Sequence, residues 1–403
     1  MKILVVCQYF CPEDFQINSI CERLAQDGNE VTVLTGLPNY PSGIIADEYK
    51  HGKKRDELLY GVHVIRCFEI GRKKGVIGLA ANYLSYCISA TRQAKKLRDD
   101  FDIVFIYQLS PVLMAIPGLK YAKKHKVPTL LYCCDLWPES LKLYIAKERN
   151  IIYRVVKRLS TAIYSSCTMV ACQSNSFLPY MKKTHALPEE RLMYLPAFAD
   201  EQYIHEDFTC ENDEVNFVFM GNLGIAQDLM TVLAAIEMMK GVPGFIVHFV
   251  GDGSCLEKMK AFVRDKKMEG IVRFYGRRPV EEMPRFYKLA DACLVSLDAS
   301  NLTGLTLPSK VQGYMAAGKP IIGMIDGSAQ EIIHESGCGV CVPAGDAAGL
   351  ANAMRDFVMN KEAYKNCGIH GRAYFMQHFR KDAFFKSLYT TLDKVRCKAN
   401  DVV

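Results

Sequence analysis

Short apolar runs alternate along the whole chain with stretches of helical spacing, and a glycine or proline turn separates most of them. Strands that alternate with helices predict parallel sheets with helices on both faces. In the first half the expected strands are residues 2–7, 31–35, 62–68, 103–107, 129–134 and 168–172. In the second half they are residues 215–220, 245–250, 272–275, 292–297, 321–325 and 339–342.

The alternation stops between residues 186 and 213, where an irregular, partly acidic stretch predicts a linker. The expected fold class is therefore α/β, with two Rossmann-like domains that face each other across a cleft. Their expected bounds are residues 1–195 and 213–375, and residues 376–403 are expected to form a helical tail that packs back on the body. Ligands of such sheets bind at the carboxyl ends of the strands, so chemistry is expected in the loops that follow them.

The composition of the chain predicts its cellular location and shows that its first half is more basic than its second. The chain has 403 residues and is half hydrophobic, but no apolar run approaches the roughly 18 to 20 residues of a membrane span. Because no signal peptide precedes the first strand, a cytoplasmic protein is expected. Residues 1–200 carry 27 Lys and Arg against 19 Asp and Glu. This basic half would attract phosphate-rich partners or an anionic membrane surface; a nucleic-acid partner is not expected.

Cysteine and acidic patterns predict neither disulfides nor a metal. The 16 cysteines are scattered through apolar segments, which is typical of buried thiols. The one C-x-x-C, Cys338 to Cys341, has no second pair at zinc spacing. Asp100 and Asp102 form a D-x-D that precedes its strand, at the wrong end of the sheet for a ligand. We therefore expect no metal and no resident cofactor.

Residues 307–331 contain the pattern of a helix N-terminus that faces an anion. Pro308 and Ser309 are expected to be an N1 and N-cap pair, and Lys310 follows in the first turn, where the helix dipole favours a phosphate. A strand comes next, and a loop with Asp326 and Gly327 ends it. Glu331 then stands where a second helix begins. An ordinary α/β turn explains this pattern about as well.

Two glycine turns follow strands in the same half. Each would let backbone N–H groups approach a phosphate, and each alone is a weak signal. Together with the Lys310 helix, they predict a nucleotide site in the second domain. The residues of these turns that we expect to contact the nucleotide are Gly221, Asn222, Gly251, Asp252 and Gly253.

The first half offers a second group of polar loops. Asp135 ends a strand and is followed by Trp137, the one tryptophan of the chain, and by Glu139. Asp135 could orient a sugar hydroxyl or accept a proton, or it could only cap the next helix. The loops after the first two strands add Glu13, Asn39 and Tyr40 as possible hydroxyl-binding residues. The first of these loops lacks the G-x-G-x-x-G fingerprint, which argues against an NAD enzyme.

Two helical stretches in the basic half carry Lys and Arg beside an apolar face. One runs from residue 76 to 90 after the cations of residues 72–74, and the other covers residues 151–165. Each could be an ordinary core-facing helix with a solvated basic face, or could lie on an anionic bilayer.

The chain resembles retaining glycosyltransferases of the GT-B fold, family 4, and in particular the capsule, O-antigen and colanic-acid branch. The motifs that carry this resemblance occur in order along almost the whole chain: M-K-I-L-V-V, Y-F-C-P-E-D-F, V-T-V-L-T-G-L-P-N-Y-P-S-G, D-L-W-P-E-S and L-P-S-K-V-Q-G-Y-M-A-A-G-K-P. Some relatives in this branch are described as transferases of N-acetyl-L-fucosamine.

The resemblance implies a nucleotide-diphosphate sugar, expected to be UDP-linked, in the second domain. It implies a lipid-diphosphate-linked or oligosaccharide acceptor on the first domain, in surface polysaccharide synthesis at the inner face of the cell membrane. The family's E-x7-E carboxylates would fall at Leu305 and Gly313 and are absent. Its Arg and Lys that contact the diphosphate would fall at Asn222 and Gln227, also changed. Lys310 is then the best remaining cation, and Glu331 keeps the family's acidic position.

Retaining transfer needs charge stabilisation on the departing diphosphate more than a protein nucleophile. We therefore expect Lys310 and Asp135 to be the catalytic residues, with Asp135 positioning the acceptor or the donor sugar. Two alternatives remain open at this stage. One is a nucleotide-sugar 2-epimerase of the same fold, and the other is a nucleotide-sugar-binding protein without turnover.

Overall fold

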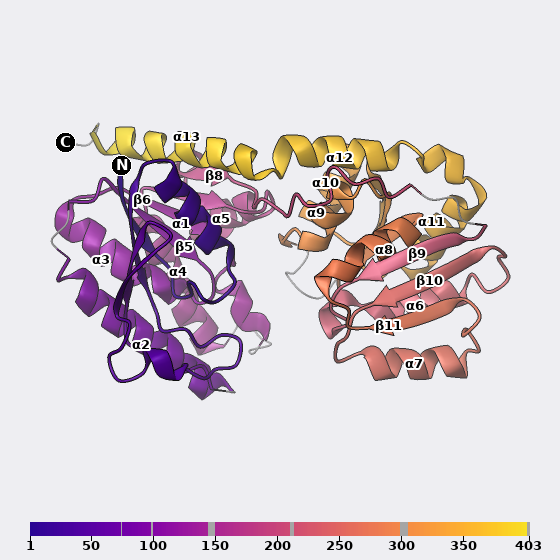
Figure 1. Cartoon of the computed structure of the whole chain (residues 1–403), viewed down its shortest axis with the longest axis horizontal. Coiled ribbons are helices and arrows are strands. Elements are labelled where there is room, and N and C mark those ends of the chain that lie inside the picture. The colour runs from indigo at the N-terminus through magenta and orange to yellow at the C-terminus, as the bar shows by residue number, and fades with distance from the viewer. Residues whose placement is uncertain (74, 98–99, 144–149, 210–212, 299–304, 401–403) are drawn as a thin grey trace. The chain divides into compact units, whose positions relative to one another are not determined.

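The computed structural model describes residues 1–73, 75–97, 100–143, 150–209, 213–298 and 305–400. The chain forms two compact units (Figure 1). Unit 1 comprises residues 1–195 and 387–403, and unit 2 comprises residues 196–386. Each unit is built around its own sheet. Among the described residues, no helix is long and apolar enough to cross a membrane.

Unit 1 contains an eight-stranded sheet of order β3-β4-β2-β1-β5-β6-β7-β8. All neighbouring strands are parallel except the β3 and β4 pair. The central strands are buried along their whole length, as expected for a sheet covered on both faces. The strands are β1 (Lys2–Val6), β2 (Glu30–Thr35), β3 (Asp56–Leu59), β4 (Val62–Arg66), β5 (Ile103–Gln108), β6 (Thr129–Cys133), β7 (Met169–Cys172) and β8 (Leu192–Tyr194).

Helices connect these strands. Within this group α2 contacts α3, and α3 contacts α4. Helix α4 begins after Asn150, whose side chain accepts a hydrogen bond from the Ile152 amide and caps the first turn. The helices of unit 1 are α1 (Gln16–Gln26), α2 (Val76–Ala94), α3 (Ile116–His125), α4 (Ile151–Ser166) and α5 (Phe177–His185), with the short 3₁₀ turns η2 (Val112–Ala115) and η3 (Glu139–Leu143) beside them.

Unit 2 contains a six-stranded parallel sheet of order β11-β10-β9-β12-β13-β14. Strand order reverses at β9, which lies between β10 and β12, so the crevice at the carboxyl ends of these strands is where a ligand is expected. The strands are β9 (Val215–Met220), β10 (Phe245–Val250), β11 (Val272–Gly276), β12 (Ala292–Ser296), β13 (Ile321–Met324) and β14 (Gly339–Val342).

Two hydrophobic clusters cover the two faces of this sheet. Phe217 and Phe219 of β9 belong to one, and Val218 and Met220 belong to the other, as the two-residue period of a strand requires. The helices are α6 (Leu229–Glu237), α7 (Leu256–Asp265), α8 (Met283–Leu289), α9 (Ser309–Ala316), α10 (Ser328–Ser336), α11 (Ala347–Met359) and α12 (Cys367–His378), with the short turns η5 (Ile225–Gln227) and η6 (Val280–Glu282) between them.

The C-terminal helix α13 (Lys381–Asn400) belongs to unit 2 up to Lys386 and to unit 1 from Ser387. In unit 1 the Tyr389 hydroxyl donates a 2.8 Å hydrogen bond to Asp27. In unit 2 the Lys381 amide donates to the Glu201 carboxylate.

The α/β fold class with two parallel-sheet domains is confirmed, and each expected strand is present. Three local expectations are wrong. The stretch expected to be an irregular linker contains edge strand β8, and β3 was not predicted; both strands are too short for a clear pattern. Pro308, in an extended conformation, is the N-cap residue of α9, and Ser309 is its first helical residue, the reverse of the expected order.

Candidate functional site

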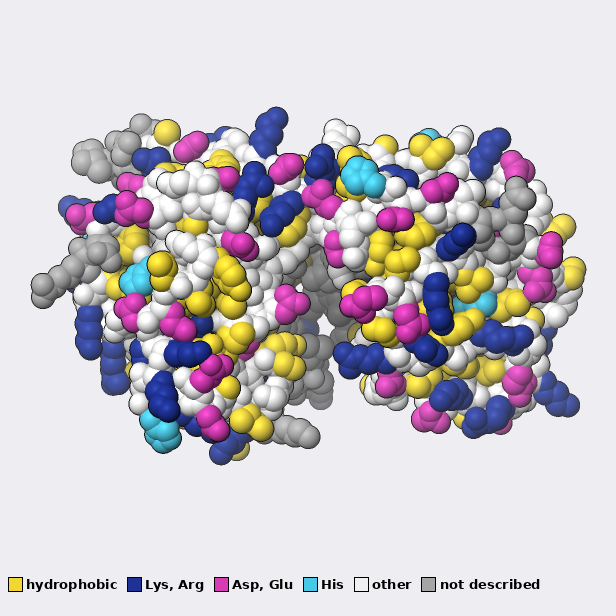
Figure 2. All heavy atoms as spheres, viewed as in Figure 1, with side chains coloured by type: hydrophobic (Ala, Val, Ile, Leu, Met, Phe, Trp, Pro, Cys, Tyr) yellow, Lys and Arg dark blue, Asp and Glu magenta, His cyan; other side chains and the backbone are white. Residues whose placement is uncertain are grey.

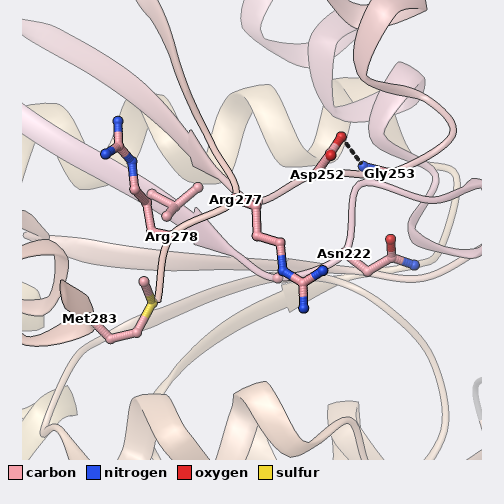
Figure 3. Close-up of a pocket in the computed structure, with 9 residues that line it drawn as sticks. Asn222, Asp252, Gly253, Arg277, Arg278 and Met283 are labelled. Carbon is pink, nitrogen blue, oxygen red and sulfur yellow. Dashed lines mark hydrogen bonds between the residues drawn. The ribbon is translucent and has the colours of Figure 1, made fainter. Parts of the chain in front are cut away.

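A pocket of about 580 Å³ opens at the carboxyl ends of β9, β10 and β11 in unit 2 (Figure 3). Its volume falls in the range of small-ligand sites. It lies next to the point where strand order reverses, as the fold predicts. The lining residues are Gly221, Asn222, Val250, Gly251, Asp252, Gly253, Arg277, Arg278 and Met283.

The glycines of this pocket let two strand-to-helix turns pack on each other. Gly251 has a φ of +147°, and a Cβ added there would lie 1.8 Å from the Gly221 carbonyl oxygen. A Cβ on Gly253 would lie 2.5 Å from the Leu223 backbone. The two turns are also joined directly, because the Leu223 amide donates a 2.9 Å hydrogen bond to the Asp252 carbonyl.

The expected backbone cradle for phosphate needs correction at these glycines. The Gly221 amide donates to the Val250 carbonyl, and the Gly251 amide donates to the Gly276 carbonyl. The Gly253 amide donates to the Asp252 carboxylate at 2.7 Å (Figure 3). Since these N–H groups already have acceptors within the protein, the glycines shape the pocket rather than offer donors to it. A role in binding a ligand stays a prediction for all of them.

Arg277 and Arg278 follow β11 directly and were not found from the sequence. Figure 3 shows the Arg277 side chain directed toward Asn222, whereas the Arg278 side chain extends in the opposite direction. The Arg278 Nε atom donates a 3.0 Å hydrogen bond to the Tyr275 carbonyl. Arg277 is exposed, so its guanidinium is available to an anion in the pocket.

The Lys310 side chain runs inward from the first turn of α9. Its ammonium lies 3.9 Å from the centre of the Phe219 ring and donates a 2.7 Å hydrogen bond to the Gln227 side-chain oxygen. A Cβ added to Gly221, which lines the pocket, would lie 3.4 Å from the Lys310 Nζ atom. Lys310 therefore lies directly behind the pocket wall. Burial lowers the pKa of the Lys310 amine to about 7.

The N-terminus of α9 keeps the properties of an anion site. No side-chain hydrogen bond caps its start, and Ser309 at the first position is exposed, but the Val311 amide already donates a 3.0 Å hydrogen bond to the Pro308 carbonyl. Further along the helix, a Cβ added to Gly313 would lie 3.1 Å from the Tyr287 hydroxyl. The position where a carboxylate was expected is thus closely approached by a buried tyrosine.

Asp326, Gly327 and Glu331 follow β13, and none of the three lines the pocket. The Asp326 carboxylate accepts a 3.2 Å hydrogen bond from the Ala344 amide. Gly327 has a φ of +70° and precedes α10, and Glu331 is exposed in the first turn of that helix. They share the carboxyl edge of the sheet with the pocket, and their assignment to ligand binding stays a prediction.

In unit 1 a hydrogen-bonded chain forms at the ends of β5 and β6. The Trp137 ring N–H donates a 3.0 Å hydrogen bond to the Ser110 hydroxyl, and this hydroxyl donates at 2.8 Å to the Asp135 carboxylate. Burial raises the pKa of Asp135, against the hydrogen bonds from Ser110. The His185 Nε2 atom lies 3.1 Å from the Trp137 carbonyl oxygen, to which it donates a hydrogen bond in the tautomer that is protonated at Nε2. The Asp135 carboxylate is therefore held by the Ser110 hydroxyl.

Asp135, Ser110 and Trp137 line a second pocket, of about 540 Å³. Of its 21 lining residues only Arg72 and Asp135 are charged. The other lining residues are Tyr9, Phe15, Tyr40, Val76, Leu79, Ala80, Tyr83, Leu84, Leu109, Pro111, Val112, Leu113, Ser140, Leu141, Ile152, Val156 and Leu159. We call this cavity the apolar pocket of unit 1.

Two residues expected to contact an acceptor, Glu13 and Asn39, have buried partners within the protein. The Glu13 carboxylate accepts from the amides of Asn39 and Tyr40, at 2.7 and 2.5 Å. Burial raises its pKa. Asn39 is 2% exposed and donates to the buried Glu69 carboxylate. Neither Glu13 nor Asn39 lines the pocket, which favours a supporting role for both.

Glu139 also has a supporting environment. Its carboxylate accepts hydrogen bonds from the hydroxyls of Tyr153 and Tyr180, at 2.8 and 2.6 Å, and pairs with Lys142 at 2.8 Å. Burial by itself would raise the pKa of Glu139, but these three partners hold it below its ordinary value. Trp137 and Tyr40 line the pocket, so they remain the expected acceptor contacts.

No group of three or more His, Cys, Asp or Glu side chains that could hold a metal occurs among the described residues. Cys338 and Cys341 are described as free thiols. Burial raises the pKa of these two thiols to about 11 and about 12, which leaves them protonated and unreactive near neutral pH.

Two parallel-sheet α/β domains, with a pocket at the strand-order reversal of the second, define the GT-B class of fold. Family comparison agrees with this. Residues 200–374 match Glycosyl transferases group 1, and residues 16–203 match Glycosyltransferase Family 4. The chain thus combines the two domains of these families and is a glycosyltransferase.

The curated relatives of this chain include bacterial glycosyltransferases. The glycosyltransferase WbjE of Pseudomonas aeruginosa is 28% identical over 69% of this chain and 70% of its own length. The colanic acid biosynthesis glycosyl transferase WcaI of Escherichia coli (strain K12) is 23% identical over 79% of this chain and 82% of its own. The crystal structure of Anabaena HepE in complex with UDP has a TM-score of 0.69 at 13% identity, and the match covers 98% of this chain and 100% of HepE.

Proposed function

We propose that this glycosyltransferase is a retaining enzyme of surface polysaccharide synthesis. In this proposal unit 2 binds a nucleotide-diphosphate sugar, expected to be UDP-linked, and unit 1 binds a lipid-linked or oligosaccharide acceptor. The observation that carries the proposal is the Lys310 ammonium, held behind the glycine-lined pocket by Gln227 and Phe219. A cation in a largely buried place is suited to stabilise the charge of a departing diphosphate.

The transfer step needs only groups that this chain and its two substrates supply. The bond between the sugar anomeric carbon and the diphosphate oxygen breaks. The acceptor oxygen forms the new bond on the same face of the sugar, and its proton passes to the departing phosphate oxygen. Lys310 and Arg277 stabilise the negative charge, and Asp135 orients a sugar hydroxyl through the carboxylate that Ser110 holds.

The nature of the donor and the pathway rests on chemistry and on similarity. The pocket of unit 2 has the exposed Arg277 guanidinium and the α9 N-terminus nearby, which suits a diphosphate. HepE was crystallised with UDP, and WcaI is described in colanic acid biosynthesis. A peripheral contact with an anionic membrane would follow from the exposed cations and apolar residues of α2 and α4.

The experiment that tests this function has two parts. Calorimetry against UDP-, GDP- and dTDP-sugars should find one nucleotide class that binds at least about tenfold more tightly than the others. Incubation of the bound nucleotide sugar with membrane-extracted acceptor should then give a glycosylated product with the donor's anomeric configuration. Conversion of the donor without any acceptor would instead favour an epimerase, and binding without turnover would favour a non-catalytic protein.

Donor binding should weaken as the pH rises. The diphosphate of a nucleotide sugar keeps its charge above neutral pH, whereas Lys310, with a pKa of about 7, loses its proton there. The dissociation constant of UDP-glucose should therefore rise by up to about tenfold per pH unit from about pH 7 toward about pH 9. Calorimetry at several pH values measures this, and the Lys310→Met protein should show a nearly flat profile. A flat profile in the unaltered enzyme would contradict a binding role for the ammonium.

Replacement of Arg277 should weaken donor binding without unfolding the protein. The exposed Arg277 guanidinium points into the pocket, so Arg277→Ala should raise the dissociation constant of UDP about 10- to 100-fold, as for a lost charge-assisted contact. The Arg278→Ala control removes the neighbouring charge, whose side chain turns away, and should change the constant less than about threefold. Equal losses in both variants would indicate a general charge effect.

A further inference from the structure

The walls of the apolar pocket of unit 1 come from elements far apart in the sequence. Leu79 and Tyr83 of α2 line it together with Val112 of η2 and Val156 and Leu159 of α4. A cavity of this size within the range of ligand sites, walled by hydrocarbon from three elements, needs an explanation beyond core packing. We infer that it binds the hydrocarbon chain of a lipid-diphosphate-linked acceptor, an inference that rests on the proposed transferase function.

The balance of polar and apolar groups favours a hydrocarbon chain over a carbohydrate as the main occupant. Hydroxyls taken out of water each need a hydrogen-bond partner. Asp135, Ser110 and the Trp137 ring N–H line the pocket and are already bonded to one another in a chain, which can orient one hydroxyl. The other polar groups of the lining are Arg72, Ser140 and the hydroxyls of Tyr9, Tyr40 and Tyr83. The remaining 13 of the 21 lining residues are apolar, so most of the cavity wall suits a hydrocarbon chain.

The pocket is continuous with apolar side chains on the surface of the same two helices. Val76 and Leu84 of α2 and Ile152 of α4 line the pocket, yet they are 61%, 50% and 52% exposed. Beside them, Ile77 is 88% and Val155 is 54% exposed. Soluble monomers seldom expose contiguous apolar surface without a partner. A lipid chain that enters along these side chains would cover them.

Cations surround this apolar surface and specify an anionic lipid. Arg72 lines the pocket, and its guanidinium lies 5.5 Å from the centre of the Tyr40 ring. Arg154, Lys157 and Arg158 are exposed on α4. Figure 2 shows hydrophobic side chains of unit 1 that reach the surface among basic and acidic side chains. This combination is complementary to a diphosphate joined to a hydrocarbon chain.

Trp137 makes the pocket directly observable, because it is the single tryptophan of the chain and lines the cavity at 8% exposure. Titration of the full chain with farnesyl diphosphate, without detergent, should change Trp137 fluorescence in a saturable way. Isopentenyl diphosphate carries the same charge with one isoprene unit. It should bind at least about tenfold more weakly, since apolar burial sets the affinity.

Two matched variants test whether the hydrocarbon chain of the lipid binds in this pocket. Ala80→Phe places a ring at an exposed helix position that lines the pocket, and it should weaken farnesyl diphosphate binding at least about tenfold. Ile88→Phe adds the same ring to α2 at an exposed residue that does not line the pocket, and it should change binding less than about twofold. Circular dichroism of both variants verifies that α2 and the fold are retained.

Each other outcome overturns the inference. Equal affinity for the two diphosphates would mean that charge alone binds. A Trp137 response to phosphatidylglycerol vesicles but not to farnesyl diphosphate would assign the surface to the bilayer. If the Ala80→Phe protein gives an unchanged titration with farnesyl diphosphate, the hydrocarbon chain binds somewhere other than this pocket. UDP binding to unit 2, measured by calorimetry in the same samples, tests the proposed function separately, because its loss would not depend on the apolar pocket.

Discussion

Lys310→Met should lower kcat/KM at least about 100-fold, which corresponds to about 2.7 kcal/mol of lost transition-state stabilisation. The Lys310 ammonium is a largely buried cation behind the glycine-lined wall, and it donates a hydrogen bond to a neutral amide, Gln227. Met keeps the length and the apolar contact with Phe219 but removes the charge. Initial rates with the donor and acceptor found in the binding and product assays measure the loss.

The same variant should fold at least as well as the unaltered protein. Burial lowers the pKa of the Lys310 amine to about 7, which means that the charged form is poorly solvated in the folded protein. An apolar side chain at this position avoids that loss of solvation. Thermal unfolding should therefore show no drop in the midpoint for Lys310→Met. Lys258→Met, which removes one exposed charge from α7, is the matched control and should keep both activity and stability. A loss in kcat/KM of less than about tenfold in Lys310→Met would refute the role given to this lysine.

The position of Lys310 also accounts for a departure from the family pattern. The resemblance places the diphosphate-binding lysine of relatives at residue 227, which is a glutamine here. Because the Lys310 Nζ atom lies 2.7 Å from the Gln227 side-chain oxygen, α9 brings a positive charge to the side chain of that same residue. The positive charge that is missing at residue 227 is thus replaced by that of Lys310 from α9.

Sequence patterns predicted the long, buried elements well because their hydrophobic period is strong. Strands such as β6 and β9 are buried at every position, and the turns that end them contain the expected Asp135 and Gly221 residues. The short edge strands β3 and β8 were missed, since three or four half-exposed residues carry little periodic signal. Their pairing is decided by the neighbouring strand, which lies elsewhere in the sequence.

Side-chain direction explains what the sequence could not show at the sites. Ser110 precedes Pro111 in a segment typical of a simple turn, and its link to Asp135 exists only because β5 and β6 are neighbours in the sheet. Arg277 belongs to an Arg-Arg-Pro sequence that directly follows a strand. This position alone could have predicted a cation at the carboxyl end of the sheet. Which of the two arginines enters the pocket depends on side-chain conformation that no spacing records.

Gly251→Ala should lower the free energy of unfolding of unit 2 by about 3 kcal/mol and abolish tight donor binding. Left-handed and related φ values above zero cost a non-glycine residue about 1 to 3 kcal/mol. In addition, the new Cβ would lie 1.8 Å from the Gly221 carbonyl oxygen, so the two turns of the pocket must separate. Gly221, Asn222 and Asp252, which line the pocket, lie on these turns. Urea and thermal unfolding measure the stability, with the transition of unit 2 identified by its shift on addition of UDP.

Gly241→Ala is the control that separates this contact from a general effect of alanine. Gly241 lies in the same unit, has a φ outside the left-handed region and would have no atom within 4 Å of an added Cβ. An alanine there should be neutral or slightly stabilising, because it reduces the freedom of the unfolded chain by about 0.4 to 1 kcal/mol. If Gly251→Ala unfolds and binds like Gly241→Ala, the two turns are not packed as described, and the glycines would have to act on the ligand directly. If Gly251→Ala is destabilised but keeps its affinity for UDP, the shape of these turns does not determine donor binding.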